Sequence, residues 1–170
     1  MGMYVKISGE GLGDLKEAIA FMKSNRVLVG IPQANASSRG EVTNVDLAFI
    51  HTNGSPRLRI PARPFLEPAI EQAKDQIEGR MRASAQAAIE GDTGAAMDEL
   101  DKAGMYGENA AKEYFTGGHF APNAGITVEG GWMRNRISGK PFKVKGKGSS
   151  QPLIDTGSLR SSITHVIEGK

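Results

Sequence analysis

The stretch Ile60-Pro61-Ala62-Arg63-Pro64-Phe65-Leu66-Glu67-Pro68-Ala69 places three prolines within eight residues, immediately before a long helical pattern. Proline fixes φ and disfavours helical geometry at the preceding residue, so Pro61 and Pro64 are expected to keep the approach extended. Pro64 or Pro68 can occupy the first helical turn, where amide protons lack partners. Arg63 lies between two prolines, so its side chain is either a solvated arm on a rigid connection or a guanidinium held for a contact.

The helices after this stretch are predicted from apolar spacing. Apolar residues follow one stripe from Pro64 to Glu90, which predicts one long helix. A second helical pattern runs from Ala95 to Phe115, and the two are expected to form an antiparallel hairpin. Gly104 and Gly107 weaken the second helix, so a kink is predicted there.

The residues before the proline stretch alternate between strand, helix and loop patterns. Residues 3–8 predict a short strand, residues 9–13 a glycine-rich break, and Asp14 to Lys23 a helix. The strongest strand pattern is Arg26 to Pro32, where the proline ends it. Residues 33–44 are small and polar without a period, which predicts a flexible loop.

Three further short elements complete the predicted fold. Asn44 is expected to cap a helix over residues 45–51, and Arg57 to Ile60 alternate like an edge strand with outward arginines. Thr164 to Ile167 contain β-formers and are expected to return to the sheet. The sequence therefore predicts a single α+β domain over residues 1–170, with a small mixed or antiparallel sheet packed by the long helix and the helical hairpin.

Residues 117–151 are predicted to be an extended basic arm. No acidic residue lies between Glu129 and Asp155, whereas six basic side chains do: Arg134, Arg136, Lys140, Lys143, Lys145 and Lys147. Such a segment is either a solvated loop or an electrostatic contact for phosphates or an acidic neighbouring subunit. The alternation at Phe142 to Lys145 indicates a β-hairpin. Trp132, the only tryptophan, is interpreted as an anchor in a local or intersubunit pocket rather than a base-stacking platform.

Composition limits the classes of protein that need to be considered. The chain has no cysteine, which excludes disulfides, thiolate metal sites and cysteine nucleophiles. Its net charge of +2 does not by itself indicate nucleic-acid binding. No apolar run reaches the length of a signal peptide or a membrane span, so a soluble protein made in the cytoplasm is expected. The 6% aromatic content and 22 glycines suggest a modest core that partner subunits complete.

Catalytic motifs are not recognisable. The three histidines, His51, His119 and His165, are dispersed and lie in no known metal or triad pattern. Gly146-Lys147-Gly148-Ser149 lacks the upstream glycine spacing of a phosphate-binding loop. We therefore expect no enzyme activity, cofactor or metal, although a hydrolase with dispersed His and Asp residues is a remaining alternative.

Two stretches together resemble a known family. The first is Ile60 to Ala69, and the second, about ninety residues later, is Pro-Leu-Ile-Asp-Thr-Gly-Ser-Leu-Arg-Ser-Ser-Ile, residues 152–163. Their order and spacing are similar to the tail-completion or neck proteins of tailed bacteriophages, of the Mu-like virion morphogenesis and related head–tail joining type. The strand ending in Val29-Gly30-Ile31-Pro32 and the pattern of Ala48, Ile50, His51 and Gly54 are also similar to that family.

The resemblance implies a non-enzymatic structural protein that acts late in virion assembly, in the neck or at the tail end, after synthesis in the host cytoplasm. It implies a ring, commonly a hexamer, that contacts the tail tube or tail terminator and the head connector or adaptor proteins, with a tail-terminator-like sheet flanked by helices. The interface candidates are Arg63, Phe65, Trp132, Asp155, Thr156, Leu159 and Arg160. The six basic side chains of the arm are the candidates for contacts with a neighbouring subunit or with DNA in the lumen.

Two details of this expectation remain open. Arg63 is expected to brace either a subunit interface or the terminal turn at Asp155, and Asp155 or Thr156 is expected to cap one helical turn over residues 158–162. The alternative function is a nucleic-acid-binding module outside virions, which would use the basic segment 134–147.

Overall fold

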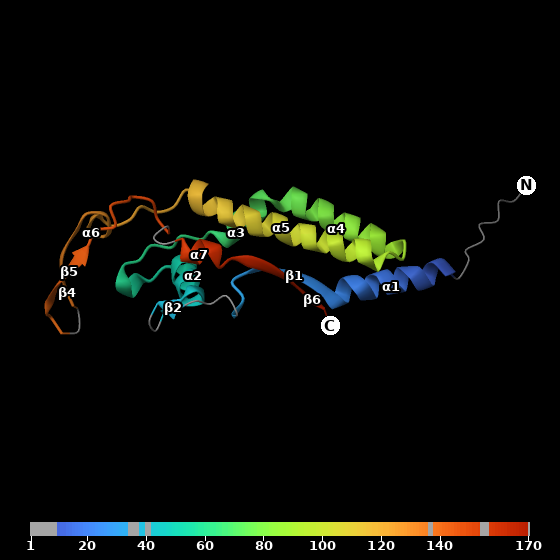
Figure 1. The fold of residues 1–170 in the computed structure, drawn as a ribbon, viewed down its shortest axis with the longest axis horizontal. Coiled ribbons are helices and arrows are strands. Elements are labelled where there is room, and N and C mark those ends of the chain that lie inside the picture. Colours follow the sequence, from blue (N-terminus) through green and yellow to red (C-terminus); the bar gives the residue numbers. More distant parts are fainter. Residues whose placement is uncertain (1–9, 34–37, 40–41, 136–137, 154–156, 170) are drawn as a thin grey trace, which may run out of the picture.

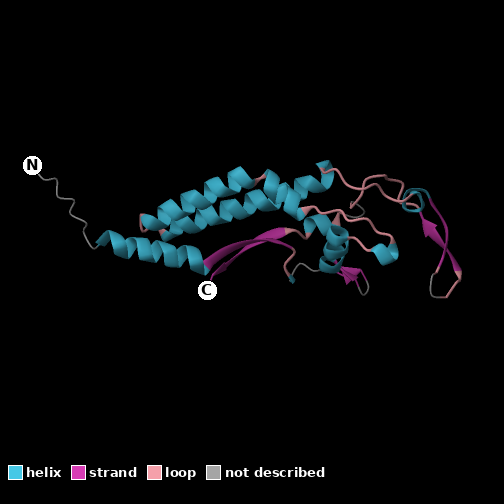
Figure 2. Cartoon of the chain, turned by 180° about the vertical axis from the view of Figure 1, so that it is seen from behind, coloured by secondary structure: helices cyan, strands magenta, loops and turns pink. Residues whose placement is uncertain are grey.

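The computed structural model describes residues 10–33, 38–39, 42–135, 138–153 and 157–169. The chain is elongated, with a body of helices at one end and a two-stranded hairpin that stands away from it at the other (Figures 1 and 2). Helices, short antiparallel strands and one helical hairpin confirm the predicted α+β class. The predicted N-terminal strand lies outside the described residues.

Three helices form most of the body. The helices α4 (Lys74–Ile89) and α5 (Thr93–Gly117) lie side by side as the predicted antiparallel hairpin, and α1 (Glu10–Ser24) packs against α4 (Figure 1). Asp92 caps α5 by accepting a 2.8 Å hydrogen bond from the amide of Ala95. The helix α1 begins four residues earlier than the predicted start at Asp14, so the glycine-rich break predicted before it is wrong.

The predicted single helix from Pro64 to Glu90 is two helices. The first, α3 (Leu66–Gln72), ends at Ala73, whose φ of −90° and ψ of 2° separate it from α4. Neither proline nor glycine causes this break. Ala69 of α3 is buried with the aromatic core and Ala73 is buried at the joint, so packing of the two segments against α5 accounts for the change of direction.

Gly104 and Gly107 do not interrupt α5, so the predicted kink is wrong. Both glycines are buried where the main sheet crosses the helix. A Cβ on Gly104 would overlap the ring of His165, and a Cβ on Gly107 would lie 2.9 Å from Cγ2 of Val29. The missing side chains therefore allow the strands to approach the helix backbone closely.

The main sheet has two antiparallel strands, β1 (Asn25–Gly30) and β6 (Thr164–Gly169). Both strands confirm their predictions. Opposed residues share a face, so the pair Val29 and His165 lies toward α5 while the pair Leu28 and Val166 lies on the outer face. Leu28 and Val166 are 43% and 39% exposed, so the outer face of the sheet carries an apolar pair open to solvent, next to the exposed charged pair Arg26 and Glu168.

The segment predicted as a flexible loop contains a small hairpin of β2 (Ser38–Arg39) and β3 (Val42–Thr43). The following helix α2 (Asn44–Asn53) is capped by Thr43, not by Asn44 as predicted. Thr43 and Asp46 form a capping box, in which the amide of Asp46 donates to Oγ1 of Thr43 at 3.1 Å. Asn44 is instead buried against the C-terminal part of the chain.

The edge strand predicted for Arg57 to Ile60 is wrong. Pro56–Leu58 form a 3-10 turn, η2, and only Ser55 and Ile60 pair, as an isolated bridge that closes it. Pro56 at the start favours the turn because its fixed φ suits the first helical position. Arg59 then adopts a left-handed conformation with φ of 56°.

Two buried clusters form the core. The larger joins α3, α5 and the short helix α7 (Ser158–Ser161) and contains Phe65, Ala69, Ala111, Phe115, Leu159 and Ile163. The rings of Phe65 and Phe115 have centroids 4.6 Å apart. A smaller cluster of Ala18, Ala88 and Ala96 joins α1 to the helical hairpin. All three members of the smaller cluster and two of the six in the larger one are alanines, which lets the helices pack closely but buries little apolar surface per residue.

Candidate functional site

The arm leaves the body after α5 and contains α6 (Gly125–Glu129) and the hairpin of β4 (Gly130–Arg134) and β5 (Pro141–Lys145). The predicted hairpin is therefore confirmed. Its two legs are joined at the base, where the amide of Lys147 donates to the carbonyl of Thr127 at 2.9 Å. The amide of Gly148 donates in the same way to Val128 at 3.0 Å.

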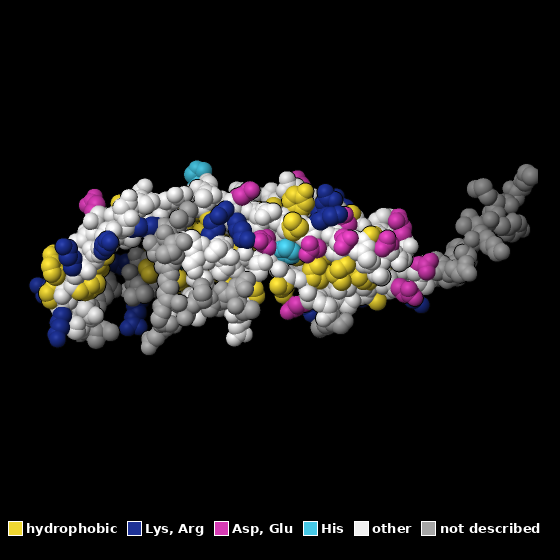
Figure 3. Space-filling model, viewed as in Figure 1, with side chains coloured by type: hydrophobic (Ala, Val, Ile, Leu, Met, Phe, Trp, Pro, Cys, Tyr) yellow, Lys and Arg dark blue, Asp and Glu magenta, His cyan; other side chains and the backbone are white. Residues whose placement is uncertain are grey.

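The register of β4 and β5 gives the hairpin two different faces. Trp132 lies directly opposite Lys143, and Met133 lies opposite Phe142. Because residues alternate along a strand and opposed residues share a face, Arg134 and Lys145 lie on the same face as Trp132 and Lys143. Met133, Phe142 and Val144 form the other, apolar face. In Figure 3, basic and hydrophobic side chains gather together over this end of the molecule.

Trp132 is 70% exposed, so the structure does not place it in a pocket of its own chain. The prediction of a local anchor is wrong, and the prediction of an intersubunit anchor stays open. An exposed tryptophan removes little apolar surface from water until a partner covers it. Trp132 is therefore the most exposed large apolar side chain in the described part of the arm.

Four of the six basic side chains of the arm are exposed around the hairpin: Arg134, Lys140, Lys143 and Lys145. Lys147 differs from them because its Nζ donates to the carbonyl of Gln151 at 2.7 Å, which ties it to the base of the arm. Arg136 lies outside the described residues. The described part of the arm thus presents a cationic, tryptophan-containing face at its far end.

Arg63 is buried and serves as the connection between the body and the arm. It is 6% exposed, and its Nε and Nη2 donate to the carbonyls of Ala121 at 2.7 Å and Pro122 at 2.9 Å. The prediction that the Arg63 guanidinium is held in one direction is confirmed. Its partners among the described residues are the carbonyls of Ala121 and Pro122. Asp155 and Thr156, the predicted partners in the terminal turn, lie outside the described residues.

A pocket of about 580 Å³ lies beside Arg63 at the base of the arm, between His51, Asn123 and Lys147. Nδ1 of His51 is buried there without a hydrogen-bond partner among the described residues. Burial, together with the positive charges of Arg63 and Lys147, lowers the pKa of His51 below its usual 6.5. No carboxylate lines the described pocket, so it lacks a partner for acid–base chemistry.

The other interface candidates fall into two groups. Phe65 and Leu159 are 3% and 6% exposed and belong to the larger core cluster, so their contacts are internal. Arg160 is exposed, and its Nε donates to the carbonyl of Lys112 at 2.7 Å, which joins α7 to α5. The N-cap residue of α7 is Gly157, with φ of 76°, and it provides no side-chain cap. The predicted caps, Asp155 and Thr156, lie outside the described residues.

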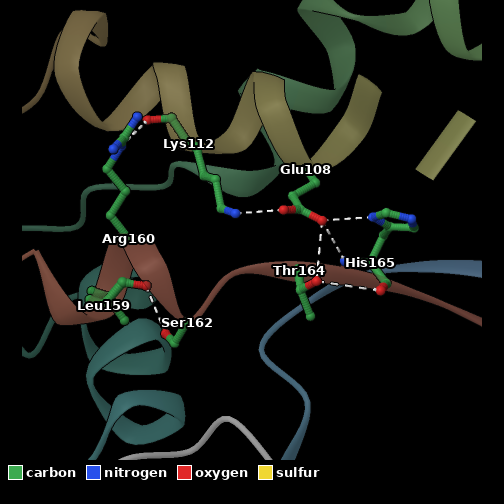
Figure 4. A network of polar contacts seen from close by, with 7 residues as sticks. All are labelled: Glu108, Lys112, Leu159, Arg160, Ser162, Thr164 and His165. Carbon is green, nitrogen blue, oxygen red and sulfur yellow. Dashed lines mark hydrogen bonds and ion pairs between the residues drawn. The ribbon is translucent and has the colours of Figure 1, made fainter. Parts of the chain in front are cut away.

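A polar network joins the middle of α5 to β6 (Figure 4). One carboxylate oxygen of Glu108 accepts from Lys112, and the other accepts from the amide of His165 at 3.1 Å and contacts its Nδ1 at 2.6 Å. Nε2 of His165 lies 3.1 Å from Asp101. Burial opposes ionisation of Glu108, but the bonds from Lys112 and His165 prevail and lower its pKa to about 2.

The sequence did not predict an apolar groove of about 570 Å³ between α2, α3 and the end of β1. Ala48, Phe65, Ile70 and Ile163 line it, and Phe49 at its side is 68% exposed. The apolar residues of α2 that line it, Val45, Ala48 and Phe49, are spaced as on any buried helix face, so they do not indicate a groove. The groove depends on how α2 and α3 meet, and no local pattern specifies that.

Comparisons with known proteins identify no relative. No family model matches the chain, and neither the curated proteins nor the solved structures contain a match. Within the part of the chain that the structure describes, no cluster of His, Asp or Glu side chains could hold a metal ion. None of the described helices combines the length and apolarity that crossing a membrane requires.

Proposed function

We propose that this chain is a structural virion protein of a tailed bacteriophage, located in the neck or at the tail end. In this proposal, copies of the chain form a ring that is built from one repeated interface, and a hexamer is the expected size. The ring completes the tail and joins it to the DNA-filled head through the tail tube or tail terminator and the connector or adaptor proteins.

The resemblance of two stretches supports the assignment to this class. Phe65 and Ala69 from the first stretch pack in the same buried cluster as Leu159 and Ile163 from the second. Residues about ninety positions apart thus form one structural unit, which is a reason to interpret the two stretches as a single paired signature. The arrangement assigns these residues to the folding of the subunit and leaves its contacts to other surfaces.

The observation that carries the assembly proposal is the projecting arm with its exposed Trp132. A hairpin of two short strands is marginally stable alone, and this one exposes Trp132, Met133 and Phe142 by 70%, 41% and 45%. Large exposed apolar side chains on a projecting element are typical of protein interfaces. A chain that assembles with copies of itself would cover Trp132, the most exposed of the three.

Particles that lack this protein provide the direct test. We expect electron microscopy to show filled heads beside unjoined tails, and supply of the intact chain to restore joined, infectious particles. Native mass measurement of the purified chain, alone and with tail tubes, should detect a ring. Joined and infectious particles formed without the protein would contradict the proposal.

A nucleic-acid-binding module is the second candidate function. Trp132 and Lys143 lie opposite each other with Arg134 and Lys145 on the same face, and a stacking aromatic among cations suits single-stranded nucleic acid. This function predicts DNA binding by the isolated chain that weakens steeply with salt. Substitution of Lys143 and Lys145 by glutamate should abolish it, and a flat salt titration would exclude it.

A further inference from the structure

The apolar groove between α2 and α3 has an acidic rim. Glu67 and Glu71 are exposed one turn apart on α3 and line the groove, whose described lining includes no lysine or arginine. Lys74 lies 3.4 Å from Glu71, but both side chains are more than half exposed, so this ion pair is weak. The groove therefore combines an apolar floor with negative charge at one side.

The hairpin face of the arm has the opposite arrangement. An apolar side chain, Trp132, is surrounded by Lys143 directly opposite and by Arg134 and Lys145 on the same face. These three cations form no ion pair with another described residue. An indole among cations matches an apolar groove with an acidic rim in both hydrophobicity and charge.

We propose that Trp132 of one copy inserts into the groove of a second copy, while Lys143 and its neighbours pair with Glu67 and Glu71. The contact is intermolecular because the far end of the hairpin stands apart from α2 and α3 of its own chain (Figures 1 and 2). Arm and groove are different surfaces, so the contact is head-to-tail, and such contacts close into rings when the rotation permits. The inference rests on the self-association in the proposed function and identifies its contact.

The single tryptophan of the chain makes the contact directly measurable. As protein concentration rises, the Trp132 emission should shift to shorter wavelength and become protected from acrylamide, in step with the mass measured by sedimentation. Trp132→Ala should raise the dissociation constant about 30-fold or more, as the loss of a hot-spot anchor does. Met133→Ala, its neighbour on the other face, is the matched control and should leave the mass unchanged.

Exchanging the charges of the arm and the groove tests whether these two surfaces bind each other. One variant carries Lys143→Glu and Lys145→Glu, and the other carries Glu67→Lys and Glu71→Lys. Each alone opposes like charges at the contact and should remain a monomer, whereas a mixture of the two restores opposite charges at every contact and should assemble. Circular dichroism of each variant confirms that loss of assembly is not loss of folding. Failure of the mixture to assemble would overturn the inference.

The outcomes separate this inference from the proposed function. Rings that form while Trp132 remains quenchable would overturn the groove contact and leave the proposed function in place. A concentration-dependent blue shift in a chain that virion assembly does not require would retain the contact and refute the phage role. If the Trp132 emission shifted on addition of single-stranded DNA but not with rising protein concentration, the partner of Trp132 would be nucleic acid. That result would overturn the inference.

Discussion

Glu108→Gln is the substitution that best tests how the main sheet is fixed to α5. The Glu108 carboxylate accepts bonds from Lys112, from the amide of His165 and from Oγ1 of Thr164, and it contacts the His165 ring. Glutamine has nearly the same shape but no charge, and its amide NH₂ must face one of these donors. The substitution therefore removes the charge and leaves the packing nearly unchanged.

The pKa of Glu108 gives the magnitude. Its fall from the ordinary 4.5 to about 2 corresponds to at most about 3 kcal/mol of stability when the group is ionised. The side chain is 17% exposed, and solvent screening reduces this value. We therefore expect Glu108→Gln to lower the free energy of unfolding by about 2 kcal/mol at neutral pH.

The stability that the network contributes is lost at both low and high pH, for different reasons. The contribution of Glu108 is complete above about 4.5, its usual pKa, and is lost as the pH falls toward about 2. Burial lowers the pKa of His165, but its bonds to Glu108 and Asp101 raise it above 6.5. The contribution of His165 is thus complete below 6.5 and is lost as the pH rises through the raised value. Glu108→Gln should flatten both slopes.

Urea unfolding followed by far-ultraviolet circular dichroism, from pH 2 to pH 9, measures this effect. Trp132 is unsuitable as the probe because it is exposed on the arm. Glu113→Gln changes the same charge on an exposed position of the same helix and serves as the control, with an expected change below about 0.5 kcal/mol. If both variants had equal stabilities and equal pH profiles, the network would not fix β6 to α5 and the reasoning would be refuted.

Three further predictions concern the fold. Gly104→Ala should destabilise the protein by about 1–3 kcal/mol in thermal unfolding, because the added Cβ overlaps His165. Gly79→Ala, with open space around its Cβ, should stabilise it by about 0.5–1 kcal/mol. If Gly104→Ala were the more stable variant, the close approach of β6 to α5 would be contradicted. Arg63→Ala should cost about 2–3 kcal/mol and speed hydrogen exchange at the base of the arm, unlike exposed Arg82→Ala; equal losses would remove its bracing role. Thr43→Ala should cost about 1 kcal/mol in urea unfolding through the lost cap, and no change would refute the capping box.

The elements that the sequence predicted well are those with a complete local signal. The strand from Arg26 to Pro32 has β-formers and a proline stop, and the pattern of Thr164 to Ile167 likewise needs no partner to be recognised. The helical hairpin follows from long apolar stripes. The break at Ala73 has no local signal, since alanine favours helix and only the packing of both segments against α5 turns the chain there.

Gly104 shows how a correct observation can support a wrong inference. Its low helix propensity favours a kink, but a buried glycine also lets a strand approach a helix closely, and the sequence does not distinguish these two roles. For the candidate site, the cations and the hairpin of the arm were predictable because charge and alternation are local. The partners of Arg63 and the groove beside Phe49 were not, because both arise from segments that no periodicity relates to one another.

The hydrogen bonds at the base of the arm determine the direction in which the arm projects. Lys147 and Gly148 bond across to Thr127 and Val128, while Arg63 holds the incoming leg. The direction of the arm is therefore specified at one joint, outside the packed core of α3 and α5. In an assembly of the proposed kind, a few degrees at this joint would set the curvature, so the circumference of the ring could change without any substitution in the core.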